Sequence, residues 1–242
     1  MIPAGAGAAR TMAAILALML AALLSISPAV ASTTEKPADA APLVSVPTGK
    51  GLPVVVRAAL FFNQIQAFND NQNTFEATTD LRLSWFDLRL RYPAEEGLNG
   101  YKEYRVSAAE AELAKMWTPR IRLVNRVGEP TFSERRLRIF PDGRVETIAR
   151  TTATYKVPVD LSRFPFDHQS LLIELVVQED TIETVDLDFS SEDVAFSRVA
   201  SSVEMDGWTP GLVNLKRELV AGWNGDRYAR VLAALDVRRV AS

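Results

Sequence analysis

The chain has 242 residues, carries a formal net charge of −3 and contains no cysteine. The absence of cysteine excludes disulfide bonds and thiolate metal sites. Charges of both signs are interspersed without a basic stripe, so a nucleic-acid partner is not expected. Residues 50–242 contain no stretch with the composition of a linker, which predicts a single domain.

The N-terminus predicts an exported protein. Residues 1–31 resemble a signal peptide, because Arg10 is followed by an unbroken apolar run at 12–24 and by Ala-Val-Ala at 29–31. An uncleaved N-terminal anchor is the alternative. Residues 32–49 are rich in proline, alanine and threonine, which predicts a flexible lead-in. No later apolar run reaches about 18 residues, so no transmembrane helix is predicted after this leader.

Most of the remaining sequence has the period of β-strands. Apolar and polar residues alternate, as expected for strands with one buried face, over residues 75–85, 171–177, 213–220 and 227–239. The Pro-Asp-Gly sequence at 141–143 supplies turn chemistry, which predicts a hairpin over residues 136–150. The Asn-Gly sequence at 224–225 predicts a second hairpin turn.

One helix is predicted over residues 108–116, with Ser107 and Glu110 as a capping box and Pro119 closing it. The acidic run at residues 190–193 has two interpretations, a weak calcium site or a solvated loop, and its spacing matches no known calcium-binding loop. Many short strands separated by turns predict an all-β fold. We expect an immunoglobulin-like sandwich of about ten strands with one short helix in its N-terminal half.

The most informative segment is residues 157–171, which read VPVDLSRFPFDHQSL. Phe164, Pro165 and Phe166 form an apolar group that proline stiffens, because its ring fixes its own φ and restricts the preceding residue. Asp167 adds one negative charge. Such a loop suits a docking surface better than a catalytic centre. His168 is the only histidine and has no nucleophile motif beside it, so no enzyme activity, metal site or cofactor is predicted.

This segment resembles the signature loop of pentameric ligand-gated ion channels, the Cys-loop receptor family. Val157 and Leu171 stand where animal members carry the two cysteines, so the chain resembles the prokaryotic type without the disulfide. Other stretches resemble the family's extracellular domain in the right order, namely WFDLRL (85–90), MWTP (116–119), NRVGEP (125–130), FPDGRV (140–145) and LDVRR (235–239). The resemblance covers about residues 51–242.

The resemblance implies a ligand-binding extracellular domain over residues 50–242, ending where the first membrane helix would begin. It implies a pentameric ring of identical subunits, a small-molecule ligand bound between neighbours beneath the hairpin at 220–226, and a membrane pore domain as partner. The location implied is the periplasmic or extracellular face of the cell membrane. Ligand binding would then be coupled to pore opening.

The resemblance also names candidate ligand-binding residues. Trp223, at the hairpin tip, is either a lid over the ligand or an aromatic packed on its own sheet. Phe75 would supply an aromatic from the neighbouring subunit. Arg136 would face the ligand, or could instead be a solvated strand residue. Gln178 and Glu179 either line the site or belong to a polar loop. Positions that carry a binding tyrosine, a central aromatic and a carboxylate in relatives are here Val124, Gln178 and Val176. This departure favours a neutral or carboxylate ligand, which arginine can hold with two hydrogen bonds.

Asp167 and Arg239 correspond to residues that couple the sensor to the pore in the family, and the alternative is an ordinary surface ion pair. Phe164, Pro165 and Phe166 would form the apolar tip that meets the membrane helices. Asp70 lies in residues 69–73, which resemble the neighbouring loop of that interface.

Two other functions remain open from the sequence. One is a soluble secreted or periplasmic pentameric binding protein without a pore. The other is a secreted β-sandwich adhesin or carbohydrate-binding module, which would be a monomer with a flat aromatic platform.

Overall fold

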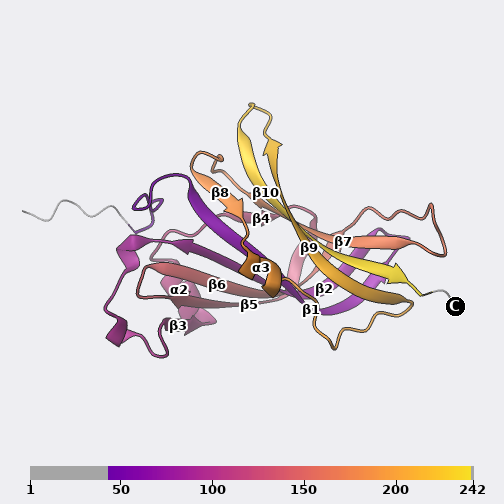
Figure 1. Cartoon of the computed structure of the whole chain (residues 1–242), viewed down its shortest axis with the longest axis horizontal. Coiled ribbons are helices and arrows are strands. Elements are labelled where there is room, and N and C mark those ends of the chain that lie inside the picture. Colours follow the sequence, from indigo (N-terminus) through magenta and orange to yellow (C-terminus); the bar gives the residue numbers. More distant parts are fainter. Residues whose placement is uncertain (1–42, 241–242) are drawn as a thin grey trace, which may run out of the picture. The chain divides into compact units, whose positions relative to one another are not determined.

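The computed structural model describes residues 43–240, so the predicted signal peptide and most of the predicted lead-in lie outside the described residues. Within this range ten strands form two sheets (Figure 1). The six-stranded sheet has the order β3-β5-β6-β2-β1-β8, and the four-stranded sheet has the order β4-β7-β10-β9. The strands are β1 (Val54–Asn69), β2 (Thr74–Phe86), β3 (Lys102–Arg105), β4 (Ile121–Leu123), β5 (Arg126–Ile139), β6 (Arg144–Lys156), β7 (His168–Val177), β8 (Val185–Asp188), β9 (Trp208–Ala221) and β10 (Arg227–Arg239).

The predicted all-β sandwich is confirmed, and its core follows from the alternation of the strands. Phe75, Ala77 and Trp85 of β2 are buried, because every second residue of a strand points to the same face. Phe75 and Ala77 share a buried cluster with Leu171 and Leu235 of the other sheet, and Trp85 shares a second one with Leu175 and Val231. Each large aliphatic side chain buried in this way stabilises the fold by about 1.5–3 kcal/mol.

Both predicted hairpins are present. β5 and β6 are joined through residues 140–143, where Gly143 has a φ of +84° and donates its N–H to the carbonyl of Phe140 at 3.0 Å. β9 and β10 are joined through residues 222–226, where Gly225 has a φ of +86°. In Figure 1 this second hairpin, in yellow, extends well beyond the neighbouring strand ends. Its tip is therefore open to solvent.

The helices differ from the sequence prediction. α2 covers Ser107–Leu113, and its N-cap residue is Val106, which makes no capping hydrogen bond through its side chain. The predicted capping box at Ser107 and Glu110 is therefore wrong. Val106 is held instead by tertiary structure, because its N–H donates to the carbonyl of Arg135 at 2.9 Å. Two short 3₁₀ turns, η1 (Leu88–Leu90) and η2 (Ala94–Glu96), follow β2.

The acidic run at residues 190–193 begins a second helix, α3 (Ser191–Phe196), which the sequence did not predict. Ser190 and Asp193 form a reciprocal capping box, and Asp193 is buried with its carboxylate 2.8 Å from the guanidinium of Arg82. The solvated-loop interpretation is therefore wrong for Asp193. Residues 43–240 contain no group of three or more histidine, cysteine, aspartate or glutamate side chains able to hold a metal ion.

The segment after α3 covers an open edge of β1. The hydroxyl of Ser197 accepts the N–H of Leu60 at 3.0 Å and donates to the carbonyl of Asp193 at 2.8 Å. The N–H of Phe62 donates to the carbonyl of Arg198 at 2.9 Å. The N–H groups of Leu60 and Phe62, which no neighbouring strand pairs, therefore have hydrogen-bond partners. Buried backbone groups generally need such partners.

Residues 157–167 form the loop between β6 and β7, as predicted. Val157 and Leu171 are both buried, so apolar packing stands where the resemblance places a disulfide. Among residues 43–240, no helix combines the length and the apolar character needed to cross a membrane.

Candidate functional site

A hollow of about 380 Å³ lies beneath the β9–β10 hairpin, and we call it the hairpin hollow. Its lining comes from β4, the end of β7, the following turn, and the two hairpin strands. The lining residues are Arg122, Val124, Glu174, Val176, Val177, Gln178, Glu179, Val220, Tyr228 and Arg230. Glu174 and Val176 alternate with the buried Ile173, Leu175 and Val177, so the hollow is on the outward face of the four-stranded sheet.

Most charges in the hairpin hollow are paired. Arg230 contacts Glu174, with Nη1 3.4 Å from Oε2, and also bonds Glu218. Glu179 pairs with Arg120. Hydrogen bonds from Lys216 and Arg230 lower the pKa of Glu218. Arg122 makes no side-chain hydrogen bond or ion pair within residues 43–240, and Nε of Arg230 is buried without a partner there. The hollow therefore offers the exposed, unpaired guanidinium of Arg122 to an incoming acceptor.

The structure brings two of the predicted ligand residues to this hollow. Gln178 and Glu179 both line it. Trp223 is 99% exposed at the hairpin tip, so the alternative of a ring packed on its own sheet is wrong, and Trp223 is outside the lining. Whether Gln178 and Glu179 touch a ligand stays a prediction.

The other two predicted ligand residues lie elsewhere. Phe75 is 1% exposed and stacks on Tyr155 with ring centroids 5.3 Å apart, so its ring is not available at the surface of this chain. Its inward position follows from the alternation of β2. Arg136 is on β5 in the six-stranded sheet, with Nε 3.8 Å from Glu103. Arg136 would reach a hairpin hollow only as part of a second copy.

The sequence did not single out Arg122, Tyr228 or Arg230. Strand alternation could have placed each of them on the outward face of its strand. Arg122 alternates with the partly buried Ile121 and Leu123. Tyr228 and Arg230 alternate likewise with the buried Ala229 on the return strand of the predicted hairpin. Only the pairing of β4 with β7, and of β7 with β10, places these outward-facing residues together.

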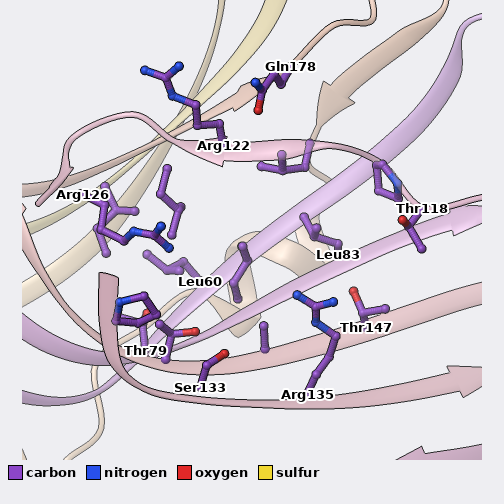
Figure 2. A pocket seen from close by; sticks show the side chains of 18 of the residues that line it. Leu60, Thr79, Leu83, Thr118, Arg122, Arg126, Ser133, Arg135, Thr147 and Gln178 are labelled. Carbon is purple, nitrogen blue, oxygen red and sulfur yellow. The ribbon is translucent and has the colours of Figure 1, made fainter. Parts of the chain in front are cut away.

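A second cavity of about 420 Å³, partly open to solvent, is lined by residues of both sheets. Figure 2 shows Arg126 and Arg135 pointing into it, whereas the guanidinium of Arg122, on β4, points away. Arg122 and Gln178 line both this cavity and the hairpin hollow. β4 is thus the wall between the cavity and the hairpin hollow. Nε1 of Trp85 is buried at the cavity without a hydrogen-bond partner among the described residues. Burial raises the pKa of Tyr155, which also lines this space.

At the other end of β10, Arg239 joins three segments. Its Nε donates to Oδ1 of Asp167 at 2.7 Å, and its Nη2 donates to Oδ2 of Asp70 at 3.1 Å. The guanidinium lies 4.2 Å from the ring centre of Trp208 and 5.1 Å from that of Phe164. Cations over aromatic faces gain further electrostatic attraction. The signature loop, the β1–β2 loop and β10 are therefore held together at one side chain.

Asp167 is 1% exposed, so it is not the acid of an ordinary surface ion pair. The hydrogen bond from Arg239 lowers the pKa of Asp167 to about 2, although burial acts in the opposite direction, and Gln169 also donates to it. By contrast, Phe164 and Phe166 are 64% and 70% exposed on either side of Pro165. The loop thus combines a buried charged base with an exposed apolar tip.

A two-sheet β-sandwich with a ligand-sized hollow under its last hairpin, and a charged junction at the far end of that hairpin, has the architecture of a ligand-binding domain of Cys-loop receptors. Residues 44–241 match the family described as the neurotransmitter-gated ion-channel ligand binding domain. The chain belongs to this family.

Two relatives are similar over most of the sandwich. The proton-gated ion channel of Gloeobacter violaceus is 30% identical over 157 residues, which are 64% of this chain and 41% of the relative. The gamma-aminobutyric acid receptor subunit theta of Mus musculus is 29% identical over 150 residues, which are 60% of this chain and 22% of the relative. The chain therefore spans less than half the length of either relative.

Proposed function

We propose that the chain is the extracellular sensing domain of a prokaryotic pentameric ligand-gated ion channel. It binds a small molecule where identical subunits meet and passes the binding event to a membrane pore. The hairpin hollow supports this proposal, because it is open on one side and a second copy can complete it. The relatives support it too, since one is named for gating by protons and the other for gamma-aminobutyric acid.

The ligand that fits the hollow best is neutral or carries a carboxylate. The unpaired guanidinium of Arg122 carries this inference, because the two glutamates of the lining, Glu174 and Glu179, are already engaged by Arg230 and Arg120. An amine would meet an unpaired like charge and no free carboxylate. A carboxylate would gain a charge-assisted hydrogen bond, and Val124, Val176 and Val220 would contact an apolar body.

The proposed route to the pore runs along β10, from Tyr228 and Arg230 at the hollow to Arg239 at the junction with Asp70 and Asp167. A ligand can shift this junction only if it binds two arrangements of the hairpin with different affinities. Phe164, Pro165 and Phe166 are proposed to contact the pore domain, because two exposed aromatic rings beside a buried ion pair form a stable apolar projection.

Calorimetry with three probes of one shape tests the ligand class. Benzoate, benzamide and benzylamine differ in charge but share a ring. We expect benzoate and benzamide to bind the purified chain at least tenfold more tightly than benzylamine. Arg122→Gln should weaken benzoate binding tenfold or more and benzamide binding much less. Light scattering on the same samples should report five copies per particle.

Arg238→Gln is the matched control, because Arg238 is an exposed arginine at the far end of β10. Its benzoate affinity should equal that of the unmodified chain. Tight binding of benzylamine that neither Arg122→Gln nor Arg136→Ala changes would contradict the proposed ligand class.

Two alternatives are less well supported. A carbohydrate-binding module needs a flat row of exposed rings, whereas Trp85, Trp117 and Trp208 are all buried. A soluble binding protein without a pore would have no use for the buried Asp167–Arg239 pair and the exposed aromatic tip, which support descent from a channel.

A further inference from the structure

The segment at residues 43–46, which we call the strap, is fastened to the sandwich by Arg89. Nη1 of Arg89 donates to the hydroxyl of Ser45 at 3.0 Å, and Nη2 donates to the carbonyls of Ser45 at 2.8 Å and Leu43 at 3.1 Å. Arg89 is itself held by two hydrogen bonds to the carboxylate of Asp87, whose side chain is fully buried. A planar guanidinium fixed in this way is a rigid anchor.

The strap also holds the loop at residues 117–120. The N–H of Trp117 donates to the carbonyl of Leu43 at 2.7 Å, and the Trp117 ring packs edge-on against Trp85 with centroids 6.0 Å apart. A pocket of about 430 Å³ separates the strap from the turn that follows β7. Its lining residues are Val44, Ser45, Val46, Met116, Trp117, Thr118, Arg120, Glu179 and Asp180.

Glu179 is common to this pocket and to the hairpin hollow, and its backbone is strained. Its φ is +72°, in a left-handed region that side chains with a Cβ disfavour. Such a conformation persists only where neighbouring groups impose it. Arg120 supplies those groups, because its side chain pairs with the Glu179 carboxylate and its carbonyl accepts the N–H of Gln178 at 2.7 Å.

We propose that the strap is a positioning element for the hairpin hollow. While the strap is seated, it fixes residues 117–120, and these hold Gln178 and Glu179 in the strained turn that walls the hollow. When the strap leaves, the turn relaxes and the hollow changes shape. The inference rests on the proposed function only in taking the hollow as the ligand site. Any partner or cleavage that removes the strap would then regulate ligand binding.

Hydrogen exchange tests the strap without a ligand. In a chain lacking residues 43–46, the amide of Gln178 should exchange at least tenfold faster than in the unmodified chain. The amide of Ile173, in the middle of β7, should keep its rate. Ser45→Ala leaves both backbone carbonyls in place and should accelerate Gln178 exchange less than threefold. Removal of residues 36–39, an equal length upstream of the strap, is the matched control and should change neither rate.

An unchanged Gln178 rate after loss of the strap would overturn the proposal. Equal acceleration at Gln178 and Ile173 would overturn it as well, because the strap would then only stabilise the whole sandwich. Benzoate calorimetry on the same variants separates the two proposals. Absence of benzoate binding in every variant would count against the ligand class alone, since the exchange rates do not depend on it. If benzoate bound several-fold more weakly only to the chain lacking residues 43–46, the result would support both the ligand class and the strap proposal.

Discussion

Asp87 and Gly143 show how single residues join motifs that are distant in sequence. Asp87 belongs to the WFDLRL motif and Gly143 to the turn between β5 and β6. The N–H of Asp87 donates to the carbonyl of Gly143 at 2.8 Å. A Cβ added at Gly143 would lie 2.6 Å from the carbonyl oxygen of Asp87. Two motifs that carried the family resemblance thus pack against each other through a position that tolerates only glycine.

Gly143→Ala should lower the free energy of unfolding by more than the roughly 1–3 kcal/mol expected for a left-handed non-glycine residue alone. The added methyl group also forces the backbone at Asp87 to move. Urea unfolding measures the loss. Gly207→Ala is the matched control, because Gly207 has a φ of +72° but no atom within 4 Å of its added Cβ. Equal losses in the two variants would show that the close approach to Asp87 costs nothing.

Asp167 should make stability depend on pH in strong acid. Its pKa is about 2 in the folded chain against an ordinary value of 3.8. Because this pKa is lowered, the ionised Asp167 carboxylate contributes fully to the free energy of unfolding above about pH 4. The contribution is lost as the pH falls toward 2. Urea unfolding between pH 5 and pH 2 should therefore show a shallower loss of stability in Asp167→Asn than in the unmodified chain.

At neutral pH, Asp167→Asn should itself reduce stability by about 1.5–3 kcal/mol, the usual value for a hydrogen bond to a charged group. Identical pH profiles for the two chains would mean that Arg239 does not stabilise the ionised carboxylate. Asp206, which is exposed and makes no side-chain hydrogen bond or ion pair among residues 43–240, offers Asp206→Asn as a control with little effect.

Among the elements, α3 illustrates what a local sequence pattern misses. Its six residues are too few to show helical periodicity, and its acidic start favours a loop interpretation. The helix forms because the Asp193 carboxylate accepts two kinds of hydrogen bond. One comes from the N–H of the N-cap residue Ser190, and the other comes from the guanidinium of Arg82 on β2, which is distant in sequence. The ring of Phe196 adds to this contact, since the Arg82 guanidinium lies 4.2 Å from its centre.

Asp193→Asn should loosen α3 from the six-stranded sheet. The buried carboxylate would lose its charge pair with Arg82, and the free energy of unfolding should fall by about 1.5–3 kcal/mol. Exchange of the Leu60 amide should accelerate too, because Ser197, just after α3, accepts that N–H. Glu192→Gln, at an exposed neighbouring position, should do neither. If the Leu60 amide exchanged faster while the free energy of unfolding stayed unchanged, the Arg82 pair would hold α3 in place without stabilising the whole sandwich. If neither changed, the pair would do neither.

For the whole molecule, strand alternation and turn chemistry were sufficient to predict the sandwich, both hairpins and the loop between β6 and β7. The candidate site was predicted less well, because it joins residues from β4, β7 and β10 that only strand pairing brings together. Phe75 is instructive, since the alternation of β2 already placed it inward while the resemblance placed it at a ligand. The alternation was the better guide, because burial of a large ring is a direct consequence of strand geometry.

The full exposure of Trp223 makes the hairpin observable by itself. The other three tryptophans are buried in the sandwich, so a water-soluble quencher such as iodide should reach only the indole at the tip. Fluorescence quenching would then report whether the hairpin is open or folded over the hollow, with no label attached. Each unmodified subunit thus contains an optical probe at the one place where its proposed ligand would enter.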